Sequence, residues 1–278
     1  MILLMIIFIY PLYYCICASF SDANKLQLHS GLILYPLGFS VKSYQILFQD
    51  AHIPRALINT VFYVIVGTSL SLLMTMLASY VLSRKRYGLK KIFLYMIVIP
   101  MYFSGGLVPF YIVVKNILNM GDSPLAILIP NAVNSFYIFI MITFFKGLPD
   151  SLEESAYIDG ANDFTILFRI IAPISMPVIA VMIVYYGVGQ WNNWFNASIF
   201  LSLKRYEWQP LQLQLRDILI QNNPLSLQLS GADYYLQQAY KLLIKYSLII
   251  LTVAPIVAIY PFVQKYFVKG VMIGSIKD

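Results

Sequence analysis

The sequence predicts an all-α integral membrane protein with six membrane-spanning helices, arranged as one transmembrane domain over residues 1–278. Hydrophobic residues make up 60% of the chain and charged residues only 11%, and the mean hydropathy is +0.74. A soluble fold would need many more charged side chains to cover such a core with polar surface. Six uncharged apolar stretches also approach or exceed the ~20 residues that a helix needs to cross a bilayer. They lie at about residues 1–20, 56–82, 92–114, 124–145, 174–200 and 246–264.

The first and third stretches carry local features of their own. Residues 1–20 could also be read as a secretory signal peptide, but they begin without a basic region and Ala18-Ser19-Phe20 is a weak cleavage site. We therefore interpret them as a helix. The basic segment that usually precedes such a helix is missing, which leaves open a truncated N-terminus. In the third stretch we expect kink and close-packing residues at Tyr102, Gly105, Gly106 and Pro109.

The orientation of the helices follows from the short loop 83–91, which is rich in basic residues. Short loops with many Lys and Arg residues stay in the cytoplasm. Alternation along the chain then places both termini and the segment 146–173 in the cytoplasm, and the stretches 21–55, 115–123 and 201–245 outside. The basic residues of the loop are Arg84, Lys85, Arg86, Lys90 and Lys91.

Several classes of function are disfavoured by what the sequence lacks. None of the six stretches contains an ionisable Asp, Glu, Lys, Arg or His, which argues against a proton-driven carrier but leaves sodium coupling open. There is no glycine-rich phosphate-binding loop, so we expect no ATPase site in this chain. The two histidines, His29 and His52, fall in an outer loop, and Cys15 and Cys17 fall in an apolar stretch. Neither catalysis nor a metal site is indicated, and the net charge of +7 needs no nucleic-acid partner.

The segment 147–173, between the fourth and fifth stretches, predicts two short helices joined by a tight turn. Ser151 and Glu154 have the spacing of a capping box that begins the first helix. Gly160 is placed to end that helix in the left-handed conformation. Asn162 or the following aspartate can cap the second helix, which must stop near Pro173.

This helix-turn-helix is too small to bury its own apolar side chains, which are Ala156, Ile158, Ala161 and Phe164. One alternative is an amphipathic hairpin that lies on the lipid headgroups. The anionic inner leaflet would repel the four acidic residues that fall within residues 153–163, which argues against this alternative. They are Glu153, Glu154, Asp159 and Asp163. We therefore expect a cytoplasmic protein to dock on this segment.

The same segment carries a recognisable pattern. Glu154-Ser155-Ala156 is followed by Gly160, and the segment closes on Ile170-Ile171-Ala172-Pro173. This pattern resembles the cytoplasmic signature of the membrane permease subunits of binding-protein-dependent ABC importers, which reads Glu-Ala-Ala, then glycine, then an Ile-x-x-Pro ending. Ser155 departs from the commoner alanine, and this exchange of one small residue for another leaves the helix face intact.

Other segments resemble the carbohydrate branch of that family, and in particular its smaller maltose-type permease. They are the triplet Asp159-Gly160-Ala161, the pair Pro173 and Pro177, and the tail 269–277. The segment 103–109 is similar to a subgroup associated with fragments of complex polysaccharides. The resemblance covers nearly the whole chain from the second stretch onward.

The resemblance implies that the helix-turn-helix is a coupling segment seated in a cleft of an ATPase subunit. It implies that Glu154 pairs with a basic residue of the ATPase, that Ala156 and Gly160 allow close approach, and that Asp159 stabilises the turn. The full set of candidate coupling residues is Glu154, Ser155, Ala156, Asp159, Gly160 and Ala161.

The resemblance also implies an assembly in the bacterial cytoplasmic membrane. Its other parts would be a homologous second permease subunit, two ATPase subunits that bind ATP and magnesium, and a solute-binding protein outside the membrane. The cargo would be an oligosaccharide, and this chain would hold no cofactor of its own. Amino acids, peptides or phosphate are alternative cargoes, and a sodium-coupled carrier is the alternative from another class.

Candidate contacts for the sugar combine aromatic rings with amides, because sugars stack on rings and hydrogen-bond to amides. Tryptophan at a membrane interface and asparagine between helices are equally good structural interpretations of the main group. That group is Trp191, Asn192, Asn193, Trp194 and Asn196, with Asn131, Asn134 and Tyr137 as weaker candidates. In the outer loop 201–245, the candidate contacts for the solute-binding protein are Tyr206, Trp208, Gln212 and Arg216.

Overall fold

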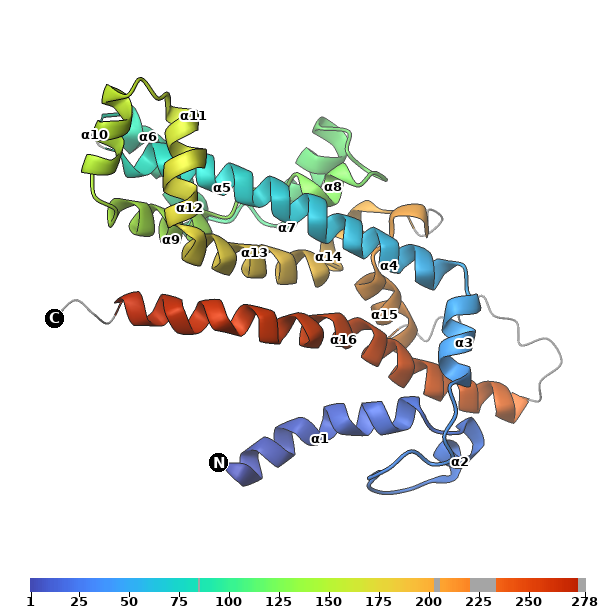
Figure 1. Cartoon of the computed structure of the whole chain (residues 1–278). Coiled ribbons are helices and arrows are strands. Elements are labelled where there is room, and N and C mark those ends of the chain that lie inside the picture. Colours follow the sequence, from blue (N-terminus) through green and yellow to red (C-terminus); the bar gives the residue numbers. More distant parts are fainter. Residues whose placement is uncertain (85, 203–205, 221–233, 275–278) are drawn as a thin grey trace. The chain divides into compact units, whose positions relative to one another are not determined.

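A computed structural model of the chain describes all residues except 85, 203–205, 221–233 and 275–278 (Figure 1). Every regular element in this described part is a helix, which confirms the predicted all-α class. The helices group into two compact units, formed by residues 1–60 with 203–259 and by residues 61–202 with 260–278. The prediction of one domain over the whole chain stays a prediction.

In the first unit, the long helices α1 and α16 share one apolar core with the shorter helices α2, α3, α4 and α15. Its core includes Ala18, Leu47, Ile53 and Leu243, which are fully or almost fully buried. Helix α4 continues into the second unit, as does α16. The elements are α1 (Ile2–Ser19), α2 (Ala23–Leu28), α3 (Lys42–Gln49), α4 (His52–Phe62), η4 (Tyr206–Trp208), α15 (Leu211–Leu219) and α16 (Tyr234–Gly274).

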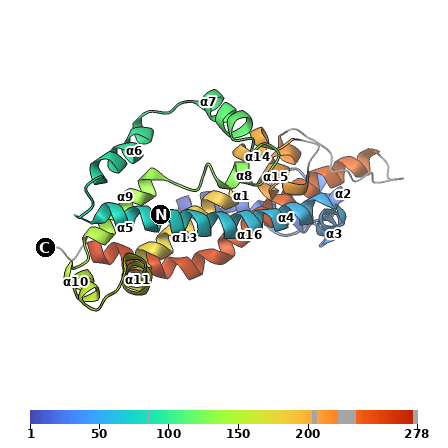
Figure 2. The ribbon, with the colours of Figure 1, turned by 90° about the horizontal axis from the view of Figure 1, so that it is seen from above.

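The second unit is organised by α5, which packs against α9 and α13 (Figure 2). Ser79 on α5 donates a hydrogen bond to the carbonyl of Ile138 on α9 at 3.1 Å. The elements are η1 (Tyr63–Gly67), α5 (Thr68–Ser83), α6 (Lys90–Tyr102), α7 (Leu107–Tyr111), η2 (Ile112–Ile117), α8 (Leu125–Leu128), α9 (Ser135–Lys146), α10 (Ser151–Ile158), α11 (Asp163–Ile166), η3 (Leu167–Ile171), α12 (Ala172–Ile174), α13 (Met176–Trp191) and α14 (Phe195–Phe200).

Two continuous helices in the described part are long and apolar enough to cross a membrane, His52–Ser83 and Gln238–Pro261. A third span is possible by composition if Asp163–Ile174 and Met176–Trp191 are joined, although the chain bends by 88° between them. The apolar helices Leu4–Ser19, Leu107–Ile117 and Ser135–Lys146 are shorter. The number of six spans therefore stays a prediction.

Helices Leu107–Ile117 and Ser135–Lys146 are short because the third and fourth predicted stretches are interrupted, and the fifth stretch is interrupted too. In the third stretch, α6 ends at Tyr102 and α7 begins at Leu107, and Gly106 between them has a φ of 84°. Residues other than glycine rarely adopt this conformation, so the expected kink residue Gly106 is what permits the break. Pro100 lies inside the last turn of α6 and removes a backbone donor there.

The fourth and fifth stretches are broken at asparagine-containing segments. Helix α9 begins after Asn134, whose side chain accepts a hydrogen bond from the backbone of Tyr137 at 3.2 Å. Such a cap favours a new helix start over continuation from α8. In the fifth stretch, α13 ends at Trp191 and α14 begins only at Phe195. The two breaks bring non-helical backbone and asparagine side chains to the same part of the second unit.

Candidate functional site: a polar pocket and an anchored hairpin

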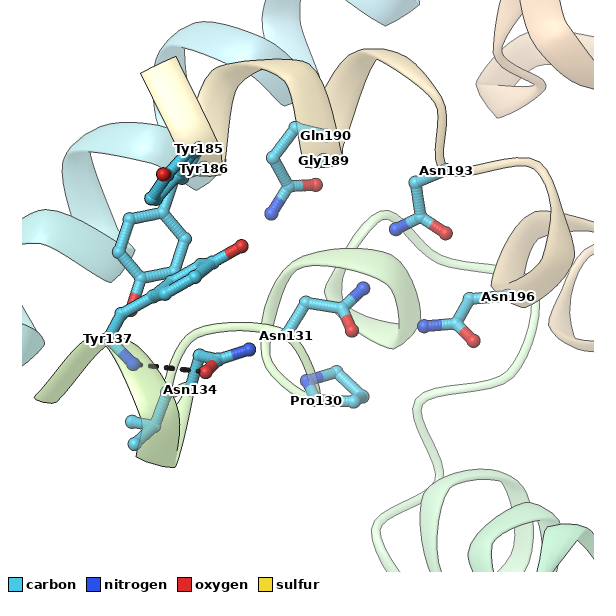
Figure 3. A pocket seen from close by; sticks show the side chains of 11 residues that line it. Pro130, Asn131, Asn134, Tyr137, Tyr185, Tyr186, Gly189, Gln190, Asn193 and Asn196 are labelled. Atoms are coloured by element: carbon cyan, nitrogen blue, oxygen red, sulfur yellow. Dashed lines mark hydrogen bonds between the residues drawn. The ribbon is translucent and has the colours of Figure 1, made fainter. Parts of the chain in front are cut away.

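A polar pocket of about 300 Å³ lies in the second unit where α8 and α9 face α13 and α14 (Figure 3). None of its lining residues carries a charge. The pocket can therefore offer hydrogen bonds and ring faces, but it cannot neutralise a charged group by itself. It is lined by Pro130, Asn131, Val133, Asn134, Tyr137, Tyr185, Tyr186, Gly189, Gln190, Asn193 and Asn196.

Three tyrosines form an aromatic wall of this pocket. Tyr137 stacks on Tyr185 with ring centroids 5.4 Å apart and an angle of 24° between the ring planes. It also meets Tyr186 edge to face at 4.9 Å. The hydroxyls of Tyr186 and Thr75 are hydrogen-bonded at 2.6 Å. These contacts hold the ring faces in fixed positions, which suits stacking on an apolar face of a ligand.

Amide groups from both sides complete the lining, and Figure 3 shows Asn131, Asn134 and Gln190 pointing into the same space. Asn131 donates a hydrogen bond to the carbonyl of Ile127 at 3.1 Å. Gln190 is only 4% exposed, and its Oε1 has no hydrogen-bond partner. A buried acceptor without a partner is costly, and a hydroxyl that reached this oxygen would satisfy it.

The position of Gln190 depends on Gly67 in η1. A Cβ atom at residue 67 would lie 2.7 Å from both Cδ and Nε2 of Gln190, closer than non-bonded atoms approach. Glycine is therefore required here for close packing rather than for an unusual backbone angle. Any side chain at this position would push the amide of Gln190 from its place beside the pocket.

The structure brings together some of the predicted sugar contacts and separates others. Five of the eight line the pocket, namely Asn131, Asn134, Tyr137, Asn193 and Asn196. Trp191 instead lies in the interior at 8% exposure, and Asn192 and Trp194 do not line the pocket either. Sequence reasoning missed Tyr185 and Tyr186, and it considered Gln190 only as the first residue of the polar run 190–196 and left it out of the candidate contacts. The spacing of four residues between Tyr186 and Gln190 could have revealed them as neighbours on one helix face.

The second candidate site is the hairpin, defined as α10 to α12 with its turn, residues 151–174. Gly160 in the turn has a φ of 80°, and Asn162 accepts a hydrogen bond from the backbone of Thr165 at 2.9 Å. Both predicted features are confirmed. The second helical part ends at Ile174, close to the predicted end at Pro173.

The predicted capping box at the start of α10 is wrong. Asp150 occupies the N-cap position with helical backbone angles, and no side chain caps the helix. Because Glu153 and Glu154 both donate backbone hydrogen bonds to the carbonyl of Asp150, Ser151 already lies inside the first turn. From there its hydroxyl is not at the N-cap position that a capping box requires.

The candidate coupling residues occupy different environments on the hairpin. Ala156 is 5% exposed and packs in a cluster of the same chain that includes Met141 and Phe145. Ile158 and Phe164 are 86% and 66% exposed. The face that remains open to a partner therefore combines these two apolar side chains with polar ones. Glu154, Ser155, Asp159 and Gly160 are exposed, and Ala161 is half-buried.

A cavity of about 830 Å³ lies beside the hairpin and mixes both charges. Nearby, burial disfavours the ionised form of Asp163, but a hydrogen bond from Tyr157 and the charge of Arg86 outweigh burial and hold the pKa of this carboxyl below its ordinary value. Burial raises the pKa of Glu153, and the charge of Arg84 only partly offsets it. The cavity is lined by Ser83, Arg84, Arg86, Lys90, Lys146, Leu148, Asp150, Glu153, Glu154 and Tyr157.

The candidate contacts for a solute-binding protein lie in the first unit. Trp208, Gln212 and Arg216 are half-buried, and the side chain of Tyr206 lies outside the described residues. The segment is tied to α4, because the amide of Asn59 donates hydrogen bonds to the carbonyls of Glu207 and Gln209 at 2.7 and 3.1 Å. Hydrogen bonds within this chain therefore hold the segment that carries these candidate residues against α4.

Replacing Gly160 by valine is expected to disrupt the hairpin turn without a steric clash. A Cβ atom at residue 160 meets no atom within 4 Å, but the φ of 80° disfavours side chains and most strongly β-branched ones. The expected cost is at least ~1 kcal/mol, and the second helix is redirected. Pull-down of the ATPase subunit that the resemblance implies is the measurement, and its yield should fall. Asparagine at residue 160 is the control, because it tolerates this conformation. Wild-type binding by the valine variant would contradict the inferred role of the turn.

Helices long and apolar enough to cross a membrane, together with an uncharged polar pocket, are typical of membrane transport proteins. No protein-family profile matches the chain. It is 35% identical over 98% of its length to the polygalacturonan/rhamnogalacturonan transport system permease protein YtcP of Bacillus subtilis, and covers 93% of that protein. It is 36% identical over 97% of its length to protein LplC of the same organism, and covers 89% of it.

A solved structure is also similar, that of a bacterial ABC transporter involved in the import of the acidic polysaccharide alginate. The TM-score is 0.85 at 26% identity, with 95% of this chain and 92% of that chain covered. The chain belongs to the family of carbohydrate ABC transporter permeases. Permease subunits of this family have no ATPase site, and the ATPase is a separate subunit of the transport system.

Proposed function

We propose that the chain forms half of the translocation pathway of an ABC importer, and that the pocket between α8, α9, α13 and α14 contacts an oligosaccharide on its way through. The observation that carries this proposal is the combination of fixed tyrosine faces with convergent amides in an uncharged pocket. Sugars present C–H faces to rings and hydroxyls to amides. A volume of about 300 Å³ is at the lower end of ligand sites. This volume suits contact with a short part of an oligosaccharide.

The proposed assembly contains a homologous second permease that completes the pathway, two ATPase subunits and a solute-binding protein. ATP and magnesium would be held by the ATPase subunits, and this chain would hold no cofactor. We place the protein in the bacterial cytoplasmic membrane with six spans and both termini in the cytoplasm, because the basic residues between α5 and α6 favour that side. Membership of the ABC family sets aside the sodium-coupled carrier.

In this proposal the hairpin is the coupling segment and the outer segment 206–216 contacts the solute-binding protein. Closure of the ATPase subunits on ATP would displace the hairpin and switch the permease between inward-open and outward-open states, a domain closure of a common type. The exposed apolar residues Ile158 and Phe164 support a partner at this face, because exposed apolar patches mark protein contacts.

Reconstitution into liposomes tests the proposed function. We expect the purified chain to transport nothing alone, and to take up labelled oligosaccharide only with the second permease, the ATPase subunits, ATP and the loaded binding protein. Transport by the chain alone under a sodium gradient would contradict the proposal. Uptake of an amino acid, a peptide or phosphate in place of a saccharide would refute the proposed cargo and keep the ABC mechanism.

Alanine substitutions in α13 and the segment that follows it are expected to separate contact from packing. Asn193 lines the pocket, so Asn193→Ala should lose one hydrogen bond of ~1 kcal/mol and slow uptake about fivefold, with normal assembly. Trp191 is buried, so Trp191→Ala should open a cavity and lower the melting temperature of the purified complex. Trp194→Ala should change uptake less than Asn193→Ala. Uptake is measured per intact complex. A normal rate for Asn193→Ala would move the sugar contact elsewhere.

A further inference from the structure

We propose that Asp163 is a positioning residue that fixes the hairpin to the end of α5, and that this attachment passes hairpin movement to the pocket. The proposal rests on the hairpin acting as the coupling segment. It concerns contacts within this chain rather than the contact with an ATPase. The geometry that points to it is the convergence of one cation and three tyrosine hydroxyls on a single carboxylate.

Asp163 begins α11 and receives donors from three other segments. Arg86, in the connection after α5, forms an ion pair with its Oδ1. Tyr157 on α10 donates a hydrogen bond to the same oxygen, and Tyr80 on α5 lies 3.5 Å from it. Tyr87 donates to Oδ2 at 3.2 Å. One side chain thus connects both helices of the hairpin with α5 and its following connection.

The tyrosine rings also hold the cation in place. The guanidinium carbon of Arg86 lies 4.6 Å from the ring centre of Tyr157 and 5.1 Å from that of Tyr87. Stacking on two rings limits the orientations of the guanidinium, and this favours the ion pair over the separated, hydrated charges. At 44% exposure for both partners, a simple salt bridge would be weak. The shared hydroxyls are what make this contact specific.

A second, buried contact also links the residues after α5 with the hairpin. Arg84 follows α5 directly, and its Nη2 forms an ion pair with Oε1 of Glu153 on α10. These two atoms are not aligned for a hydrogen bond. The side chains of Arg84 and Glu153 are 7% and 12% exposed. Removing one partner of such a buried pair leaves an uncompensated charge and damages folding. Asp163 is therefore the more informative residue to change, because its site is half open to solvent.

Helix α5 and Gly67, the last residue of η1, contact three residues that line the pocket. The hydrogen bonds and close approaches of α5 and Gly67 follow one another along the chain from residue 80 back to residue 67. They are Tyr80 with Asp163, Thr75 with Tyr186, Ser71 with Asn131, and Gly67 with Gln190. All eight residues belong to the second unit. A displacement of the hairpin that moves α5 together with η1 would therefore change contacts of three pocket residues, Asn131, Tyr186 and Gln190.

Hydrogen exchange on the full-length permease tests the attachment without any partner. In Asp163→Ala, amides of residues 151–166 should exchange about fivefold faster, because local opening becomes easier. Removal of the exposed charge of Arg169, by Arg169→Ala, is the matched control and should leave exchange unchanged. Equal exchange in Asp163→Ala and wild type would overturn the proposal, whatever the transport data show.

The number of saccharide molecules transported per ATP in the reconstituted complex tests whether this attachment passes hairpin movement to the pocket. Asp163→Ala should keep assembly and basal ATPase activity and reduce saccharide transported per ATP at least threefold. The charge swap Arg86→Asp with Asp163→Arg should recover part of this loss, whereas a role in folding alone would not be rescued. An unchanged ratio in Asp163→Ala, or a swap no better than either single change, would refute the proposal. Failure of the wild-type complex to couple ATP to uptake would refute the proposed function instead.

Discussion

Glu154→Lys is expected to abolish coupled transport while the chain still folds and enters the membrane. Glu154 is exposed in the first turn of α10 and lines the mixed-charge cavity beside the hairpin. A lysine there would meet the cations of the cavity as well as the basic residue expected on the ATPase. Like charges at a close interface cost several kcal/mol, so stimulation of the ATPase by loaded binding protein should fall at least tenfold. The cations of the cavity are Arg84, Arg86, Lys90 and Lys146.

Two neighbouring substitutions make this result specific. Glu154→Gln removes the charge without adding a cation and should reduce stimulation only partly. Glu153→Gln removes the buried partner of Arg84 and should lower the melting temperature of the permease instead. Stimulated ATPase activity and uptake are measured on complexes of equal purity. Wild-type stimulation in Glu154→Lys would show that this carboxylate does not face the ATPase.

The contrast between Glu153 and Glu154 could not have been predicted from the sequence. Both are acidic and both fall in the first turn of one helix, so the pattern alone assigns them the same solvated face. The structure separates them because one side chain turns towards Arg84 at the end of α5 and the other remains exposed. Such a difference depends on which helix packs against the hairpin, and local sequence contains no information on that.

Local chemistry did predict the features that depend on one residue and its neighbours. Gly160 in the left-handed conformation and Asn162 as a helix cap are of this kind. The error at Ser151 is also local, because the backbone at Asp150 is already helical and moves the helix start by one residue. Interruptions of the apolar stretches were expected only around Gly105 and Gly106. The break after α13 has no proline or glycine to mark it.

The residues of the pocket likewise could be predicted only in part from the local sequence. Asparagines and tryptophans stood out in an apolar sequence, and Tyr137 was noticed beside Asn134, but Tyr185 and Tyr186 within an apolar run resemble ordinary packed residues. Gln190 belongs to the site because α13 faces η1 at a position where Gly67 leaves room for it. That complementarity joins residues more than a hundred positions apart in the chain. It appears only in three dimensions.

Gly67→Ala is expected to slow uptake about tenfold by displacing Gln190, with little loss of assembled complex. The new Cβ would lie 2.7 Å from the Gln190 amide, which is the end of a flexible side chain and can swing away. Alanine also favours a helix over glycine by up to ~1 kcal/mol, which offsets part of the packing cost. The lost amide contact and a methyl group at the edge of the pocket should each weaken the hold on a sugar hydroxyl.

The matched control is Gly187→Ala on α13, where a Cβ would lie 3.8 Å from the hydroxyl oxygen of Thr68, an ordinary contact distance. Its uptake should stay near wild type. The double variant Gly67→Ala with Gln190→Ala should be no slower than Gln190→Ala alone, because the added methyl group then has no amide to displace. Uptake per intact complex is measured for all four variants. If Gly67→Ala slows uptake further in the Gln190→Ala background, the glycine acts on the pathway by another route. If Gly67→Ala alone transports at the wild-type rate, Gln190 does not contact the cargo from the position that the structure gives it.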